Sequence, residues 1–282
     1  MQRRNNKQRS VALEARKERS RAGFQIDVTD VANVSLFLAA FIGLWQLVVV
    51  LELLPPTLMP SPQSVAASVG KLVANNSLLV GIGTSLWRLG AGFAISIGLG
   101  GLVGLAMVKF PGFGKTMSSF AVGLLTFPSI AWVPFSILLI GFNDFGILFV
   151  VVMASVFSVM ITTYSAIRNV PPLYMRSAKN MGASGYSLFR YVMIPAATPS
   201  LIMGLRQAWS FAWHALIGAE MLITTLYGLG HVLSIGREFN DISQIVAIMI
   251  TIFVIGMIFD RVIFSKLEEK VRTRWGLNQH SE

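Results

Sequence analysis

The chain has no cysteine, which excludes disulfide bonds, thiolate metal sites and cysteine nucleophiles. Charged residues are also scarce, since they make up only 13% of the 282 residues, whereas soluble proteins usually carry about 25%. Hydrophobic residues make up 54% and are collected in long runs. This combination excludes an ordinary soluble domain and predicts an all-α, polytopic membrane protein.

Six apolar runs are long enough to cross a bilayer, which takes about 20 helical residues. Together they predict a transmembrane domain over 34–266, between a basic N-terminal tail over 1–33 and a charged C-terminal tail over 267–282. A helix at the membrane interface is expected between the first two spans, where Val65, Val69 and Leu72 recur at helical spacing. The expected spans are 34–54, 78–108, 117–142, 146–167, 196–223 and 245–264.

The net charge of +10 could indicate a nucleic-acid partner, but the distribution of the charge favours a membrane. If the N-terminus lies inside and the spans alternate, nineteen of the 23 lysines and arginines fall on the inner side. This is the positive-inside pattern, and it predicts a multi-pass protein of the cytoplasmic membrane with both termini in the cytoplasm. The basic tail is then expected to meet anionic lipid, and no nucleic acid is needed.

Ionisable side chains within spans are costly, so they are candidates for function. Arg206, Trp209, Trp213 and Glu220 share one broad face of the fifth span, and His214 borders that face. Two interpretations stay open. These residues either line a substrate path or tie helices together, for example Arg206 to a carbonyl and Glu220 to Arg88 or Arg237. The full set of candidates for a path is Arg88, Pro128, Trp132, Arg206, Trp209, Trp213, His214 and Glu220.

No catalytic constellation and no metal-ligand spacing is visible in the sequence. Gly114-Lys115-Thr116 has the appearance of a phosphate loop, but Lys109 stands where such a loop requires its first glycine, and no strand precedes it. The chain is therefore expected to be no enzyme and to bind no metal or cofactor of its own.

A polar and basic stretch over 171–195 lies between the fourth and fifth spans. A short helix is expected over 173–181, ending at Gly182, because glycine readily adopts the positive φ of a helix C-terminus. Ser184 can cap a second short helix over 186–192, which Pro195 follows. Two short helices joined by a glycine turn at the membrane surface suit docking into another protein.

This stretch resembles the signature loop of ABC-transporter permeases of the bacterial importer type. That loop reads Glu-Ala-Ala, three residues, Gly, nine residues and Ile-x-Leu-Pro. The spacing is kept here, although Arg replaces the Glu and Ser replaces the first Ala, as the chain reads Arg176-Ser177-Ala178, Gly182 and Val192-Met193-Ile194-Pro195. The similarity is closest to permeases of nitrate, sulfonate, taurine or bicarbonate importers, over 60–65, 85–93, 127–142 and 212–222.

The resemblance implies six core helices per subunit and a homodimer whose two copies form the path. It also implies an extracytoplasmic substrate-binding protein and separate ATPase subunits that hold ATP and Mg²⁺. The substrate is expected to be a small anion such as nitrate, a sulfonate, taurine or bicarbonate. Alternatives are a pyrimidine-type vitamin precursor, or a stand-alone secondary transporter or channel. Coupling to the ATPase is expected through Arg176, Ser177, Ala178, Gly182, Ala183, Ser184 and Pro195.

Overall fold

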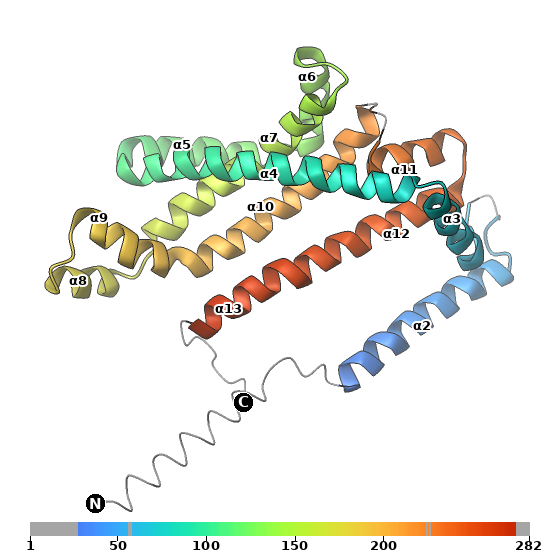
Figure 1. Ribbon diagram of the computed structural model, residues 1–282, viewed down its shortest axis with the longest axis horizontal. Helices are drawn as coiled ribbons and strands as arrows, with labels where there is room; N and C mark the ends of the chain where they lie inside the picture. Colours follow the sequence, from blue (N-terminus) through green and yellow to red (C-terminus); the bar gives the residue numbers. More distant parts are fainter. Residues whose placement is uncertain (1–27, 56–57, 224, 226, 275–282) are drawn as a thin grey trace, which may run out of the picture. The chain divides into compact units, whose positions relative to one another are not determined.

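The computed structural model describes residues 28–55, 58–223, 225 and 227–274, so most of the predicted N-terminal tail and the end of the C-terminal tail lie outside the described residues. Within these ranges the regular structure is entirely helical. The predicted all-α class is therefore confirmed (Figure 1). The chain divides into two compact units, Met1–Pro62 and Gln63–Glu282, each considered by itself.

The first unit contains one long helix, α2, over Val28–Val50. Its stretch Ala32–Val50 is apolar enough to cross a membrane, and it starts and ends earlier than the 34–54 expected from the sequence. A turn follows, in which Glu52 has a φ of 51°. The Trp45 indole N–H donates to the Pro60 carbonyl at 3.0 Å, which holds the turn against the end of the helix.

The second unit holds the remaining helices, whose arrangement is shown in Figure 1. Short 3-10 and π-helical segments (η) connect some of them. In chain order these elements are α3 (Pro62–Ala74), α4 (Ser77–Lys109), α5 (Pro111–Leu125), η1 (Ser129–Ala131), α6 (Trp132–Leu139), α7 (Asp144–Arg168), α8 (Pro172–Asn180), α9 (Gly185–Leu188), η2 (Phe189–Met193), α10 (Ile194–Leu222), α11 (Leu229–Glu238), α12 (Ile242–Phe259), η3 (Asp260–Ser265) and α13 (Lys266–Arg274).

Five helical stretches are long and apolar enough to cross a membrane, and a bent pair makes a sixth. The bent pair replaces the single span expected over 117–142, because the chain turns by 91° between Pro111–Leu125 and Ser129–Leu139. The turn lies at Pro128, which has no N–H to donate and disfavours helical geometry in the residue before it. The number of spans agrees with the predicted polytopic membrane protein.

Two further segments differ from their sequence-based description. The expected break before Pro195 is absent, because α9 continues through the π-helical η2 into α10, and the Ile194 N–H donates to the Phe189 carbonyl five residues back. Pro195 therefore stands inside a continuous helix, directly after the π-helical turn, and such local adjustments accommodate the missing N–H of a proline in membrane helices. Between the fifth and sixth spans lies α11, which was not predicted from the sequence although Leu229, Val232 and Leu233 recur at helical spacing.

Helices α4, α7 and α10 form the core of the second unit, and α4 lies very close to α7. A Cβ atom added at Gly100 would lie 2.6 Å from the Val156 carbonyl oxygen, closer than side chains normally approach. Nearby, the buried Ser155 hydroxyl donates to Ser96 Oγ at 2.8 Å. Small residues therefore permit near contact of the two backbones, as is common between membrane helices.

Replacing Gly100 by Ala should lower the free energy of unfolding by about 1–3 kcal/mol, because the new methyl group would force α4 and α7 apart. Gly101→Ala is the matched control, since nothing lies within 4 Å of a Cβ at that position. The same helix then gains an alanine without a clash. The measurement is a denaturant titration of the purified protein in detergent. Equal effects of the two substitutions would contradict the close packing of α4 on α7.

Candidate functional site

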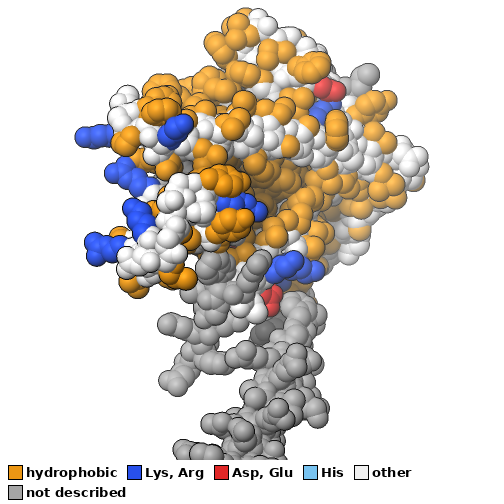
Figure 2. All heavy atoms as spheres, turned by 60° about the vertical axis from the view of Figure 1, so that its left-hand side comes forward, with side chains coloured by type: hydrophobic (Ala, Val, Ile, Leu, Met, Phe, Trp, Pro, Cys, Tyr) orange, Lys and Arg blue, Asp and Glu red, His pale blue; other side chains and the backbone are white. Residues whose placement is uncertain are grey.

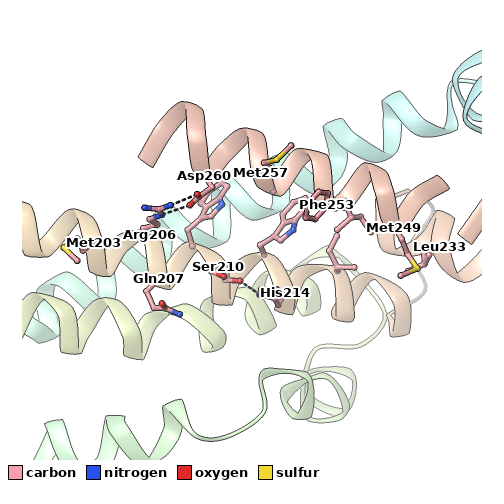
Figure 3. Close-up of a pocket in the computed structure, with 15 residues that line it drawn as sticks. Met203, Arg206, Gln207, Ser210, His214, Leu233, Met249, Phe253, Met257 and Asp260 are labelled. Carbon is pink, nitrogen blue, oxygen red and sulfur yellow. Dashed lines mark hydrogen bonds and ion pairs between the residues drawn. The ribbon is translucent and has the colours of Figure 1, made fainter. Parts of the chain in front are cut away.

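A cavity of about 770 Å³ lies between α10 and α12 (Figure 3). Most of its lining is apolar or aromatic and includes Met203, Met249, Met257 and Phe253. Four of the residues singled out from the sequence also line it: Arg206, Trp209, Trp213 and His214. The face of α10 that carries these residues therefore borders an open space. We call this space the α10–α12 pocket.

Arg206 is neutralised by carboxylates at the α13 end of the pocket. Its Nε and Nη2 atoms donate to the two carboxylate oxygens of Asp260, each at 2.5 Å, and its Nη1 lies 3.4 Å from Glu268 Oε2. The expected tie from Arg206 to a carbonyl is wrong, since its partners are side chains more than fifty residues away in the sequence. The two-pronged geometry is the strong form of an arginine–carboxylate pair. It leaves little positive charge for an anionic ligand.

Aromatic stacking joins the same helices beside this ion pair. The Trp209 ring lies on the Phe259 ring with centroids 5.0 Å apart, and it meets Phe93 edge-on at 5.2 Å. Such offset and edge-on pairs are the favoured arrangements of aromatic side chains. Trp209 thus both lines the pocket and packs α10 against α4 and the end of α12.

His214 adds a polar imidazole to the lining of the pocket. Its Nδ1 atom lies 2.7 Å from the Ser210 carbonyl oxygen, and since a carbonyl only accepts, Nδ1 carries the proton of this hydrogen bond. In the neutral ring Nε2 is then an acceptor on an exposed side chain. The amide of Gln207 lies in the same lining. The pocket can therefore exchange hydrogen bonds with a ligand through Gln207 and His214.

Arg88 and Glu220 do not line this pocket, because they form a separate buried cluster. Arg88 Nη1 donates to Glu220 Oε1 at 2.8 Å, so the predicted tie of Glu220 to Arg88 is confirmed, whereas Arg237 takes no part in it. Arg88 Nη2 donates to Asp144 at 2.6 Å. No local pattern indicated that Asp144, the first residue of α7, would join, because it lies 56 residues from Arg88. The cluster ties α4, the start of α7 and α10 together.

The turn before α11 supplies further hydrogen bonds to the Glu220 carboxylate. The Gly230 N–H donates to Glu220 Oε2 at 3.0 Å, and the Ser85 hydroxyl donates to the same oxygen at 2.7 Å. Gly228 has a φ of 148°, and a Cβ there would lie 2.6 Å from the Glu220 carboxyl carbon. Glycine is therefore required for the backbone to pass so close to the carboxylate.

Pro128 and Trp132 lie away from the α10–α12 pocket, beside a smaller cavity of about 230 Å³. The Trp132 ring meets Phe127 and Phe149 edge-on, at centroid distances of 5.4 and 6.3 Å. This aromatic cluster packs the bend between α5 and α6 against α7. The path candidates from the sequence therefore fall into three groups: the pocket, the Arg88–Glu220 cluster and this bend.

The residues of the signature loop come together on a turn between two short helices. Gly182 has a φ of 87°, and the Ala183 N–H donates to the Ala178 carbonyl at 2.9 Å, which closes α8 as expected for a helix that ends in glycine. The Ser184 N–H donates to Ser187 Oγ at 3.1 Å and so starts α9. Arg176 and Gly182 are exposed, whereas Pro195 is half-buried.

Apolar side chains fix this turn to the spans. Met175 and Phe189 pack against a buried cluster formed by Ala166, Ile167 and Val170 at the end of α7, together with Ala197 of α10. The turn is therefore held at both of its ends by the spans that it connects.

Glu220→Gln should lower the free energy of unfolding by about 3 kcal/mol, because it removes the buried counter-charge of Arg88. Glu238→Gln on α11 is the matched control, since that side chain is exposed and its replacement should change the stability little. The measurement is the thermal unfolding midpoint of each variant in the same detergent. Equal midpoints would mean that Asp144 alone satisfies Arg88.

Comparison with known proteins gives relatives along most of the chain. Residues 96–272 match the family model described as "Binding-protein-dependent transport system inner membrane component". The putative aliphatic sulfonates transport permease protein of Escherichia coli strain K12 is 30% identical over 240 residues, which are 85% of this chain and 90% of that protein. The bicarbonate transport system permease protein of Synechocystis is 28% identical over 177 residues, 63% of each chain.

A chain of the MetNI methionine ABC transporter, solved in inward-facing conformations, has a similar fold. The TM-score is 0.52 at 19% sequence identity, and the match covers 70% of this chain and 96% of that one. The likeness concerns the helical arrangement alone. From the family match and the 30% identical relative, the chain belongs to the binding-protein-dependent transport system inner membrane components, the permease subunits of ABC importers.

Proposed function

We propose that two copies of this chain form the membrane path of an ATP-driven importer, and that each copy takes up the motion of a separate ATPase subunit through residues 176–195. ATP and Mg²⁺ would bind to that ATPase and not to this chain. An extracytoplasmic binding protein would deliver the substrate. The termini and the α8–α9 turn would then lie in the cytoplasm, in agreement with the distribution of basic residues.

The observation that carries this proposal is the continuity between the α8–α9 turn and α10. The helical stretch Gly185–Leu222 contains 38 residues without a break and includes α9, η2 and α10. Only 169–171 separate α7 from α8. A displacement of the turn is therefore transmitted directly to α10, whose middle lines the α10–α12 pocket. Transport then depends on the coupling free energy between the ATP state of the partner and the position of α10.

The relatives support a small anion as the substrate, since two of them are named for aliphatic sulfonates and bicarbonate. The charge of the pocket does not add to this support, because Asp260 and Glu268 neutralise Arg206. Selection of an anion would then rest mainly on the binding protein, with Gln207 and His214 giving hydrogen-bond contacts along the path.

A neutral ring compound of the pyrimidine type is a second candidate substrate. The observation that favours it is the aromatic and methionine lining of a pocket without a free cation. Uptake of a labelled sulfonate, measured with and without an excess of a neutral pyrimidine, separates the two candidates. A sulfonate carrier should take up the label and ignore the pyrimidine, whereas a pyrimidine carrier should take up no labelled sulfonate.

Gly182→Arg should lower the amount of ATPase that co-purifies with the tagged chain from its native membrane by at least about tenfold. Only glycine takes a φ of 87° without strain, and a long side chain would stand on the exposed turn. Gly112→Arg is the matched control, because this glycine is exposed on α5 and a Cβ meets nothing within 4 Å. A chain that carries no ATPase, and transports without ATP, would instead be a stand-alone transporter or channel.

His214→Ala should reduce the transport rate about tenfold while the assembly with the ATPase stays intact, if the α10–α12 pocket is part of the path. The side chain is exposed in the pocket, so its removal opens no core cavity. His231→Ala on α11 serves as the control, because His231 does not line the pocket. Uptake by reconstituted vesicles and co-purification of the ATPase are measured side by side. Loss of assembly would assign His214 to packing.

A further inference from the structure

The segment 172–191, which we call the docking tip, presents basic and apolar side chains to its surroundings. Three exposed cations stand on it: Arg176, Lys179 and Arg190. Among them lie large exposed side chains, with Met181 88%, Tyr186 75% and Tyr191 72% exposed. Figure 2 shows Lys and Arg side chains in a column on the left of the view, with apolar side chains between them and no acidic side chain beside them.

The chain itself offers no counter-charge to these cations. The sequence contains no Asp or Glu between Asp144 and Glu220, so the docking tip holds no carboxylate, and α7 and α10 hold theirs at the ends away from it. In the part of the chain that the structure describes, ion pairs form only at Arg88 and Arg206. Arg190 lies over the Tyr191 ring, 5.9 Å from its centroid, which leaves its charge uncompensated.

Neighbouring segments add charge of the same sign. Lys109 ends α4, Lys115 stands early in α5, and Arg168 ends α7, and all three are exposed. Leu105 and Val108 of α4 belong to the same apolar cluster as Met175 and Phe189 of the docking tip. These cations therefore stand at the same end of the unit as the docking tip. Together they create a positive potential that favours a negatively charged partner.

The exposed apolar side chains of the docking tip form a second face. Met175 and Phe189 already pack against the ends of α7 and α10, so the side toward the spans is occupied. Tyr174, Met181 and Tyr186 are not part of that packing and remain exposed. An apolar centre with a charged rim is the usual composition of a protein interface.

We propose that the ATPase surface that receives the docking tip is an apolar cleft bordered by Asp and Glu side chains. The inference rests on the proposed function, and it adds the chemistry of the partner. The cleft accepts Met181 and the tyrosines, and its carboxylates lie opposite Arg176, Lys179 and Arg190. An anionic lipid surface would also attract these cations. A lipid headgroup surface would leave Tyr174, Met181 and Tyr186 without an apolar partner. A protein cleft explains both the cations and the exposed apolar side chains.

The test uses the double variant Arg176→Glu/Lys179→Glu of the full chain, purified with its ATPase from the native membrane. Like charges then face each other across the interface, and retention of the ATPase should fall about tenfold or more at about 50 mM NaCl. The neutral variant Arg176→Gln/Lys179→Gln should show a smaller loss. Raising NaCl to about 500 mM should release the ATPase from the wild type much more than from the neutral variant.

The matched control is Lys71→Glu/Arg237→Glu, which makes the same change of charge at two exposed positions on α3 and α11. It should keep the ATPase. If the wild type itself carries no ATPase, the proposed function fails. If the wild type carries it and the Arg176→Glu/Lys179→Glu variant keeps it equally at both salt concentrations, the acidic cleft is overturned while the permease function stands.

Vesicles of phosphatidylserine and phosphatidylcholine test the lipid alternative. Each variant, solubilised with its ATPase, is mixed with such vesicles and sedimented. The acidic cleft predicts that the Arg176→Glu/Lys179→Glu variant loses the ATPase in detergent, where no vesicle is present. A variant that keeps the ATPase in detergent and loses only vesicle binding would assign the cations to lipid and overturn the proposal.

Discussion

A charge buried inside a membrane protein has to meet its counter-charge there, and this requirement fixes the meeting of α4 and α10. Arg88 and Glu220 are almost completely buried and lie 2.8 Å apart. Removing Arg88 would leave the buried Glu220 carboxylate without a counter-charge, and removing Glu220 would leave Arg88 with Asp144 as its one carboxylate partner among the described residues. The position of α10 depends on this pair at one end. The α10–α12 pocket and the docking tip both depend on the position of α10. The Arg88–Glu220 ion pair therefore helps to position both, although it contacts neither.

The same helix has different partners along its length. At one end Glu220 accepts hydrogen bonds from a hydroxyl and a backbone N–H in addition to Arg88. Nearer the middle of the helix, Arg206 meets Asp260 in a partly exposed pair, which tolerates rearrangement better than a buried one. The middle of α10 borders an open pocket. The helix is thus tied by a buried ion pair near Glu220 and by a partly exposed one near its middle, and the second is compatible with the motion proposed for α10.

Local signals in the sequence were sufficient for the number of apolar spans and for the turn of the signature loop, but not for the bent pair of helices. Apolar runs predict spans because a bilayer demands a helix of fixed length, and Gly182 predicts the end of α8 because its conformation is a local property. The partners of Arg206 could not be predicted, since Asp260 lies 54 residues away and only the packing of α12 brings it near. The 91° turn was not expected within the span predicted over 117–142, because a proline interrupts a helix but does not by itself fix the angle between the two parts.

Both π-helical segments lie where a long helix approaches the end of a span, and each adds one residue to a turn. In an α-helix successive residues are rotated by about 100°, so removing one residue from η3 would turn everything after it by that angle. Asp260 would keep its place, but Glu268 would leave the side of Arg206. A single residue in η3 therefore sets the rotation of α13 about the helix axis relative to α12. This rotation decides whether Arg206 has one carboxylate partner or two.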